Sequence, residues 1–150
     1  MAETRDYGAH GHLFRGPVTT TTSIASASGI TSTSATAGIG YATGAGGAVT
    51  QATNRTTGVT INKVSGAITT DATSLAAAGE AAFTVTNSTV AATDVVVVAL
   101  KTDSATGTSF AYVSNIADGS FEITVTNLHA TTADTSASVI NFVVIKAVAA

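Results

Sequence analysis

Residues Phe121-Glu122-Ile123-Thr124-Val125-Thr126-Asn127 alternate apolar and polar side chains along most of their length. Successive side chains of a β-strand point to opposite faces, so this pattern predicts a strand with one buried and one exposed face. Phe83-Thr84-Val85-Thr86-Asn87 has the same pattern and ends in the same four residue types. The match is too short to indicate a duplication, but both segments predict half-buried strands.

Two further apolar runs lack this clean alternation. They are Asp94-Val95-Val96-Val97-Val98-Ala99-Leu100 and Val139-Ile140-Asn141-Phe142-Val143-Val144-Ile145. Such runs are typical of strands that are covered on both faces, either in the centre of a sandwich or at a subunit interface. We expect at least one of them to be an interface strand.

The chain from Ala48 onward consists of short runs of Val, Ile, Thr and Phe separated by Gly, Asn, Asp and Ser, which is the pattern of an all-β domain. We predict an antiparallel β-sandwich, with a jelly roll as one option. The predicted strands cover about 48–53, 58–63, 66–70, 80–87, 94–102, 109–115, 120–127 and 136–148. Residues 73–79 are the one segment predicted as helix, at most a turn or two that ends at Gly79.

Residues 1–47 differ from the predicted domain, residues 48–150. They are rich in Thr, Ser and Gly and have too few spaced hydrophobic side chains to form a core, so we predict an extended, irregular N-terminal arm that orders against a partner. The glycine cluster 38–47 is not followed by a Lys-Ser or Lys-Thr pair or by a predicted helix, which argues against a phosphate-binding loop.

Composition narrows the possible functions. Hydrophobic residues make up 45% of the 150 residues, but many are Ala and only 5% are aromatic, so we expect subunit association to add to the burial. The net charge of −3 and six scattered Lys and Arg residues predict no nucleic-acid partner. Without Cys there is no disulfide or thiolate metal site.

The N-terminus does not resemble a signal peptide, and the run 95–100 is far shorter than the roughly 20 residues of a membrane-spanning helix, so we expect no membrane partner.

Candidate catalytic and metal-binding residues are few. His129 lies in a predicted turn, and no Gly-x-Ser-x-Gly segment accompanies it. His10 and His12 could bind a metal together with Asp6, but an arm without a third fixed ligand predicts no metal site. The domain offers seven acidic residues for glycosidase chemistry, but most of them fall in predicted turns, where Asp caps the backbone. The seven are Asp71, Glu80, Asp94, Asp103, Asp118, Glu122 and Asp134. We therefore predict no enzyme activity, no catalytic residues and no cofactor.

Several segments carry a resemblance to a known family. The clearest is Tyr41-Ala42-Thr43-Gly44-Ala45-Gly46-Gly47-Ala48-Val49-Thr50-Gln51, which continues to Lys63 and is followed by similar segments at 66–69, 91–97 and 139–146. Residues 41–148 thereby resemble a β module of structural proteins of tailed bacteriophages and prophages. The resemblance implies a virion component and a homotrimer, and such modules are attached to several parts of the particle.

A compact domain with a short arm suits a capsid decoration (cement) protein. In this interpretation the arm binds the major capsid protein on the outer surface of the assembled head, anchored by Tyr7, Leu13, Phe14 and Arg15, because aromatic and Arg side chains carry most interface energy. The protein would be made in the host cytoplasm and reside on the capsid surface of the virion. The alternative is a tail-fibre or head-fibre knob that binds host-surface glycans. Phe110 and Tyr112 offer few aromatic platforms for sugars, which disfavours it.

Overall fold

The protein is described by a computed structural model that covers residues 31–32, 34–36, 38–103 and 109–148. The chain divides into two units between Ile39 and Gly40, and the eight strands found in the described residues belong to the second unit. The first strand begins at Gly46, so the last two residues of the predicted arm are part of the sandwich.

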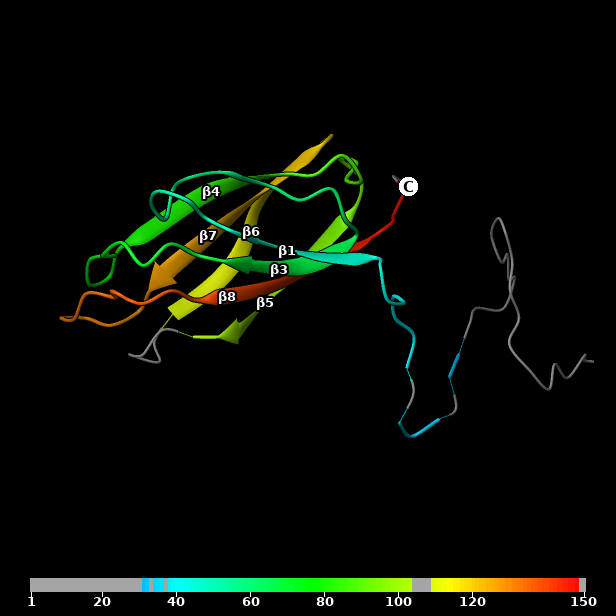
Figure 1. The fold of residues 1–150 in the computed structure, drawn as a ribbon, viewed down its shortest axis with the longest axis horizontal. Coiled ribbons are helices and arrows are strands. Elements are labelled where there is room, and N and C mark those ends of the chain that lie inside the picture. The colour runs from blue at the N-terminus through cyan, green and yellow to red at the C-terminus, as the bar shows by residue number, and fades with distance from the viewer. Residues whose placement is uncertain (1–30, 33, 37, 104–108, 149–150) are drawn as a thin grey trace, which may run out of the picture. The chain divides into compact units, whose positions relative to one another are not determined.

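Eight strands form two four-stranded sheets (Figure 1). We name them sheet A, with the order β1-β3-β8-β5, and sheet B, with the order β2-β4-β7-β6. The predicted all-β sandwich is confirmed. The strands are β1 (Gly46–Thr50), β2 (Val59–Thr60), β3 (Ser65–Thr69), β4 (Glu80–Thr86), β5 (Val95–Thr102), β6 (Ser109–Ala117), β7 (Ser120–Asn127) and β8 (Val139–Ile145).

The chain passes from one sheet to the other at every connection except β6–β7. Two successive crossings bring the chain back in its original direction, so β1 pairs with β3, and β2 with β4, in parallel. Both sheets are therefore mixed, whereas the sequence predicted antiparallel pairs only. The later strands return between earlier ones: β8 lies antiparallel between β3 and β5, and β7 lies antiparallel between β4 and β6.

The core lies between the sheets and contains the alternating side chains that the sequence predicted. Phe121 of β7 and Phe142 of β8 meet across the two layers, with ring centroids 5.4 Å apart and planes tilted by 50°. Burying one such side chain contributes about 1.5–3 kcal/mol. The other apolar side chains that are at most 1% exposed belong to the same core: Ile68, Val85, Ile123, Val125, Ile140 and Val144.

The repeated Thr-Val-Thr-Asn segments end in two buried asparagines that have equivalent roles. Asn87 donates to the carbonyl of Lys63 and accepts from Thr89 N–H. Asn127 donates from Nδ2 to the carbonyls of Leu75, Ala76 and Thr132 at 2.9–3.2 Å. Because β4 and β7 are antiparallel neighbours, the two side chains fix the loops at opposite ends of sheet B.

The prediction of a short helix at residues 73–79 is wrong. Leu75 forms an isolated antiparallel bridge with Asp134, in which each backbone N–H donates to the other residue's carbonyl at 2.8 Å. A turn follows, with Ala78 at φ 53° and Gly79 N–H bonded to the carbonyl of Ala76. Tertiary pairing of a buried leucine thus overrides the local helix propensity of the alanines.

Strand bounds also differ from the prediction at β2 and β8. β2 is two residues long, because Lys63 N–H turns back to the carbonyl of Ile61. β8 starts at Val139, and the preceding residues are held by Arg55 and Thr70, which bond the carbonyl of Ser136 and the N–H of Ser138.

The two runs without clean alternation are not covered on both faces in the single chain. One face of each contributes to the core, through Val96 and Phe142 among others, whereas Val95, Val97 and Ile145 on the other face are 47–51% exposed. The expectation that the sandwich itself covers both faces is therefore wrong. The expectation of an interface strand stays a prediction.

Asp94, just before β5, fastens the end of β8. Its Oδ2 accepts from the Lys146 ammonium and from Ala91 N–H, and its Oδ1 accepts from Ala147 N–H. The hydrogen bond from Lys146 lowers the pKa of the Asp94 carboxyl below its usual range, and the bond from Ala91 lowers that pKa further.

Replacing Asn127 by alanine should destabilise the domain by about 1–3 kcal/mol, because the fully buried amide and its hydrogen bonds to three loop carbonyls are lost. Urea denaturation measures this difference. Asn115→Ala, at an exposed position in β6, is the control and should change the free energy of unfolding by less than about 0.5 kcal/mol. Equal effects of the two substitutions would contradict the role of Asn127.

Replacing Asp94 by asparagine should destabilise the domain at neutral pH and have little effect in acid. The pKa of Asp94 is lower in the folded protein than in the unfolded chain, where it is near 4. The ionised carboxylate therefore stabilises the folded state fully above the unfolded pKa, and this stabilisation is lost as the pH falls through the folded pKa. We expect the urea midpoints of the two proteins to differ at pH 7 and to converge as the pH falls toward 2. A difference that does not depend on pH would contradict the ionic contribution.

Candidate functional site

The anchoring residues predicted from the sequence, Tyr7, Leu13, Phe14 and Arg15, lie outside the described residues. The same holds for Asp6, His10 and His12, which the sequence singled out as possible metal ligands. In the described ranges, no group of three His, Cys, Asp or Glu side chains is placed to hold a metal ion. Over those ranges there is also no helix that is long and apolar enough to cross a membrane.

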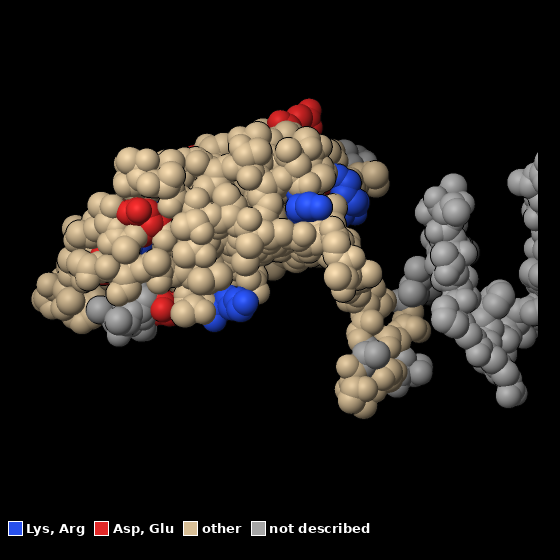
Figure 2. Space-filling view, viewed as in Figure 1, with Lys and Arg blue, Asp and Glu red and all other residues tan. Residues whose placement is uncertain are grey.

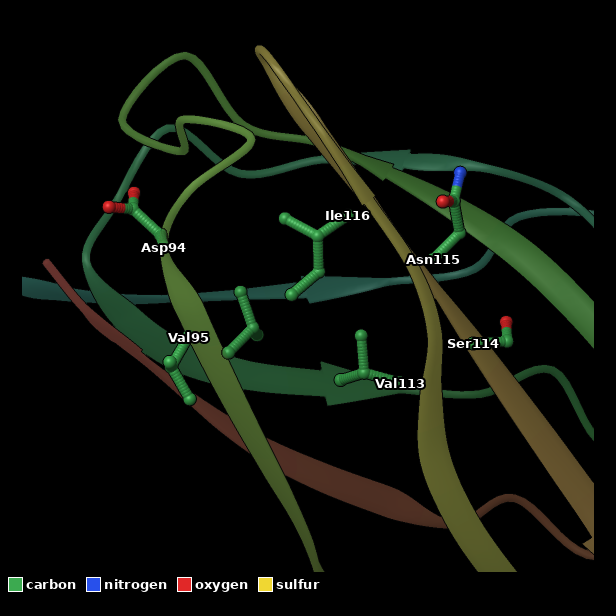
Figure 3. A pocket seen from close by; sticks show the side chains of 7 residues that line it. Asp94, Val95, Val113, Ser114, Asn115 and Ile116 are labelled. Atoms are coloured by element: carbon green, nitrogen blue, oxygen red, sulfur yellow. The ribbon is translucent and has the colours of Figure 1, made fainter. Parts of the chain in front are cut away.

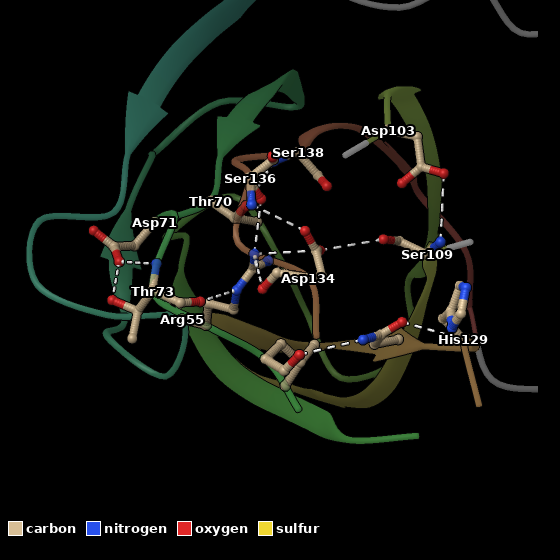
Figure 4. Close-up of polar contacts among 12 residues, drawn as sticks. Arg55, Thr70, Asp71, Thr73, Asp103, Ser109, His129, Asp134, Ser136 and Ser138 are labelled. Carbon is tan, nitrogen blue, oxygen red and sulfur yellow. Dashed lines mark hydrogen bonds and ion pairs between the residues drawn. The ribbon is translucent and has the colours of Figure 1, made fainter. Parts of the chain in front are cut away.

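A buried polar cluster lies at one end of the sandwich (Figure 4). Arg55 and Asp134 are 4% and 0% exposed and form an ion pair at 3.2 Å. Arg55 also donates to the carbonyls of Thr73 and Ser136, and Asp134 accepts from the N–H of Ser136 and the hydroxyl of Ser109. The pair therefore joins the loops after β1, β3 and β7.

The geometry of this cluster is that of a structural clamp. His129 at its margin uses Nδ1 to accept from the N–H groups of Thr131 and Thr132, so the nitrogen that could act as a base is occupied by its own loop. Asp71 caps Thr73, whose hydroxyl lowers the pKa of the Asp71 carboxyl. These contacts fix the backbone conformation of the loops, and the hydroxyl of Ser109 serves the same cluster as a donor to the buried Asp134 carboxylate.

The prediction that aspartates cap turns is confirmed. Each of the five aspartates of the domain accepts a hydrogen bond from a backbone N–H of a neighbouring loop or strand end. Glu80 and Glu122 differ, because they lie within strands and accept from hydroxyl groups of adjacent strands. The aspartates are Asp71, Asp94, Asp103, Asp118 and Asp134.

A groove of about 470 Å³ runs between the edge strands β5 and β6, which belong to different sheets. Val113 and Ile116 point from β6 toward β5, whereas Asn115 lies on the opposite side of β6 (Figure 3). The side chain of Asp94 at the end of the groove is already bonded to Lys146. Because the groove is lined by apolar side chains and offers no unpaired charged group, it is better suited to contact with another chain than to catalysis.

An aromatic pair lies on the outer face of sheet B. The rings of Phe110 and Tyr112 stack with centroids 5.9 Å apart, and Phe110 is 53% exposed. Their neighbours on β7 are Thr126 and Thr124, and Ser114 follows along β6. Rings beside hydroxyls could receive a sugar, which makes this the candidate glycan site of the alternative function.

The outer face of sheet A holds three of the four large hydrophobic side chains that are exposed in the described strands, Val95, Val97 and Ile145. Val95 pairs with Ile145, and Val97 pairs with Val143 in the next row, so that four branched side chains project together. Lys101 is the one charged side chain among the strand residues of sheet A, all of which the structure describes. In the view of Figure 2, the charged side chains lie around the margin of a wide uncharged area.

Sequence reasoning missed the pairing of Arg55 with Asp134, which are far apart in the chain and carry no local signal. It also left the apolar face undefined, because the strand order decides which valines share a surface. The sequence signal that pointed to this face was the lack of clean alternation in the runs 94–100 and 139–145.

Comparisons with known proteins found no relative of this chain. No family model, no curated protein and no solved structure matches the chain. The functional interpretation therefore rests on the surfaces described above and on the sequence resemblance.

Proposed function

We propose that the protein is a bacteriophage capsid decoration (cement) protein, in which the sandwich forms an oligomeric knob and the residues before it attach the knob to the head. The observation that carries the proposal is the exposed apolar, nearly uncharged outer face of sheet A. Such a face is typical of a protein that acts by binding other proteins. The resemblance of residues 41–148 to phage structural modules supports the virion location and a trimer.

Attachment by the N-terminal residues is consistent with how the domain begins. Tyr41 donates from its hydroxyl to the carbonyl of Val144 at 2.6 Å, which fastens the start of the domain beside β8. The residues before it can therefore serve a partner without loss of the core. In the proposed mechanism, they bind neighbouring copies of the major capsid protein on the assembled shell, and this binding stabilises the closed shell by mass action.

The alternative function is a fibre knob that binds host glycans, and the stacked pair of Phe110 and Tyr112 is the observation that favours it. Glycan-array binding by the protein, lost in Tyr112→Ala, would support this alternative. The number of copies per virion separates the two functions: hundreds support decoration, and a handful support a fibre.

Deleting residues 1–16 should abolish binding to purified heads and leave the thermal unfolding of the sandwich unchanged. Over the described ranges, the hydrogen bonds that hold the sandwich join Tyr41 and later residues. Co-sedimentation with heads and circular dichroism measure the two effects.

A point substitution refines this test. Arg15→Ala should weaken head binding by about tenfold or more, as for an interface anchor, whereas Arg5→Ala is the matched control and should have little effect. A deletion variant that still decorates heads would contradict the proposed attachment.

A further inference from the structure

β5 is an outer strand of sheet A, and its hydrogen-bonding directions follow from those of β8, its neighbour in the sheet. Val144 N–H donates to the carbonyl of Val64 at 2.8 Å, on the side of β3. In an antiparallel ladder the N–H and C=O of one residue point to the same side, and the side alternates along the strand. Val143 therefore points toward β5, and Val97, which lies opposite it, points toward β8.

The alternate residues of β5 consequently direct their backbone groups away from the sheet. These residues are Val96, Val98 and Leu100. Over the described residues, their N–H and C=O groups have no hydrogen-bond partner. Their side chains belong to the core side, where Val96 is buried and the other two are partly buried. Such an unpaired row of backbone groups is a template for another strand.

The other outer strands of the two sheets are less suited to pairing. β2 has two residues and β1 has five. β6 is longer, but its register shifts between Val113 and Asn115. In β5 the ladder is regular from Val95 to Leu100, and the irregularity and the charged Lys101 come at its end. Short strands, bulges and charges are the features that prevent edge pairing, so β5 is the edge that is open to another strand.

We infer that β5 pairs antiparallel with β5 of a second copy of the chain, about a two-fold axis at Val98. In this register Val98 lies opposite its own counterpart, and Val96 of each copy lies opposite Leu100 of the other. Each of these pairs exchanges two backbone hydrogen bonds, so every open group of the three residues gains a partner. A two-fold axis makes the same strand complementary to itself.

The neighbouring registers fit less well. A shift of one copy by two residues would place Leu100 opposite Asp94, whose N–H already donates to the carbonyl of Ala91. The opposite shift would place Val96 opposite Thr102, beyond the irregularity of the ladder. The register centred on Val98 avoids both conflicts.

The same register supplies an occupant for the groove between β5 and β6. Val96 lines this groove of about 470 Å³, and Val113 and Ile116 point toward β5 from its other side (Figure 3). Residues that lie directly opposite each other share a face of the sheet, with Cβ atoms about 5 Å apart. Leu100 of the second copy, opposite Val96, therefore lies at the groove. Its side chain, only partly buried in its own sandwich, covers the apolar lining.

Charge and area are compatible with a second copy. The two Lys101 side chains lie about 20 Å apart in this register, beyond the screening length of about 8 Å at physiological salt. A strand of eight residues is about 27 Å long, and two layers with their outward side chains are about 20 Å thick. This edge measures about 540 Å² per copy, or about 1,100 Å² in total. That exceeds the roughly 1,000 Å² expected of a biological interface by a small margin, so we expect reversible dimerisation.

The inference goes beyond the proposed function and does not rest on it. Pairing at one edge joins two copies, whereas the resemblance of the sequence supports a trimer. The tests below use purified full-length protein without heads, so they can fail while head binding succeeds, and the reverse.

Disulfide crosslinking tests the register directly, because the chain has no Cys of its own. Val97 of one copy lies opposite Ala99 of the other, with Cα atoms about 4.5 Å apart, which a disulfide can join. The two copies of Val97 are diagonal neighbours about 7–8 Å apart, which is too far. We expect co-expressed Val97→Cys and Ala99→Cys proteins to crosslink under oxidation several-fold more than Val97→Cys alone. Ala82→Cys, on the exposed outer face of sheet B, is the control and should crosslink with neither.

Three outcomes would overturn the inference. They are crosslinking of the pair no greater than with the Ala82→Cys control, crosslinking of Val97→Cys alone as efficient as that of the pair, and the absence of a dimer at every concentration in analytical ultracentrifugation.

A proline at the axis gives an independent measurement. Val98→Pro removes an N–H that points to the open edge and leaves the hydrogen bonds between β5 and β8 in place. It should weaken dimerisation by about tenfold or more. Val97→Thr is the control, because it changes the outer face of sheet A and keeps every edge group, and it should dimerise like the parent protein. Circular dichroism verifies folding.

Unchanged dimerisation of folded Val98→Pro would overturn the inference. If that variant does not fold, the crosslinking experiment alone decides.

Discussion

The structure depends on contact between two sheets that are made largely of small side chains. Phe121 and Phe142 are the largest side chains that meet between the layers, and each belongs to a central strand of its sheet. Their central position lets the neighbouring Val and Ile side chains pack around them. With few large residues, the domain also relies on fixed loops, which explains the buried asparagines and the pair of Arg55 and Asp134 at the sandwich ends.

Local patterns in the sequence predicted the parts of the fold that depend on neighbours in the chain. The alternation at Phe83 and Phe121 correctly identified β4 and β7 and the side chains that they bury, and the turn preference of aspartate correctly identified the caps. Pairings between distant segments were not predictable in this way. The parallel β1–β3 and β2–β4 pairs arise from successive crossings between sheets, and the bridge of Leu75 to Asp134 replaced a predicted helix.

The same division applies to function. The residues predicted to anchor the protein on a capsid lie outside the described residues, so their role is supported by the sequence alone. The apolar face of sheet A, in contrast, became visible only when the register placed Val95 beside Ile145 and Val97 beside Val143. A sequence can indicate that a run is too apolar for a solvated strand, but the three-dimensional arrangement shows which surface it forms.

The position of β8 constrains how the domain can be made. β8 is the last strand of the chain and yet lies inside sheet A, between β3 and β5. During synthesis, β3 and β5 cannot join one sheet until β8 has left the ribosome, and their exposed edges must wait for it. Folding of the sandwich therefore waits for β8, and loss of β8 would remove the middle of the sheet rather than trim its edge.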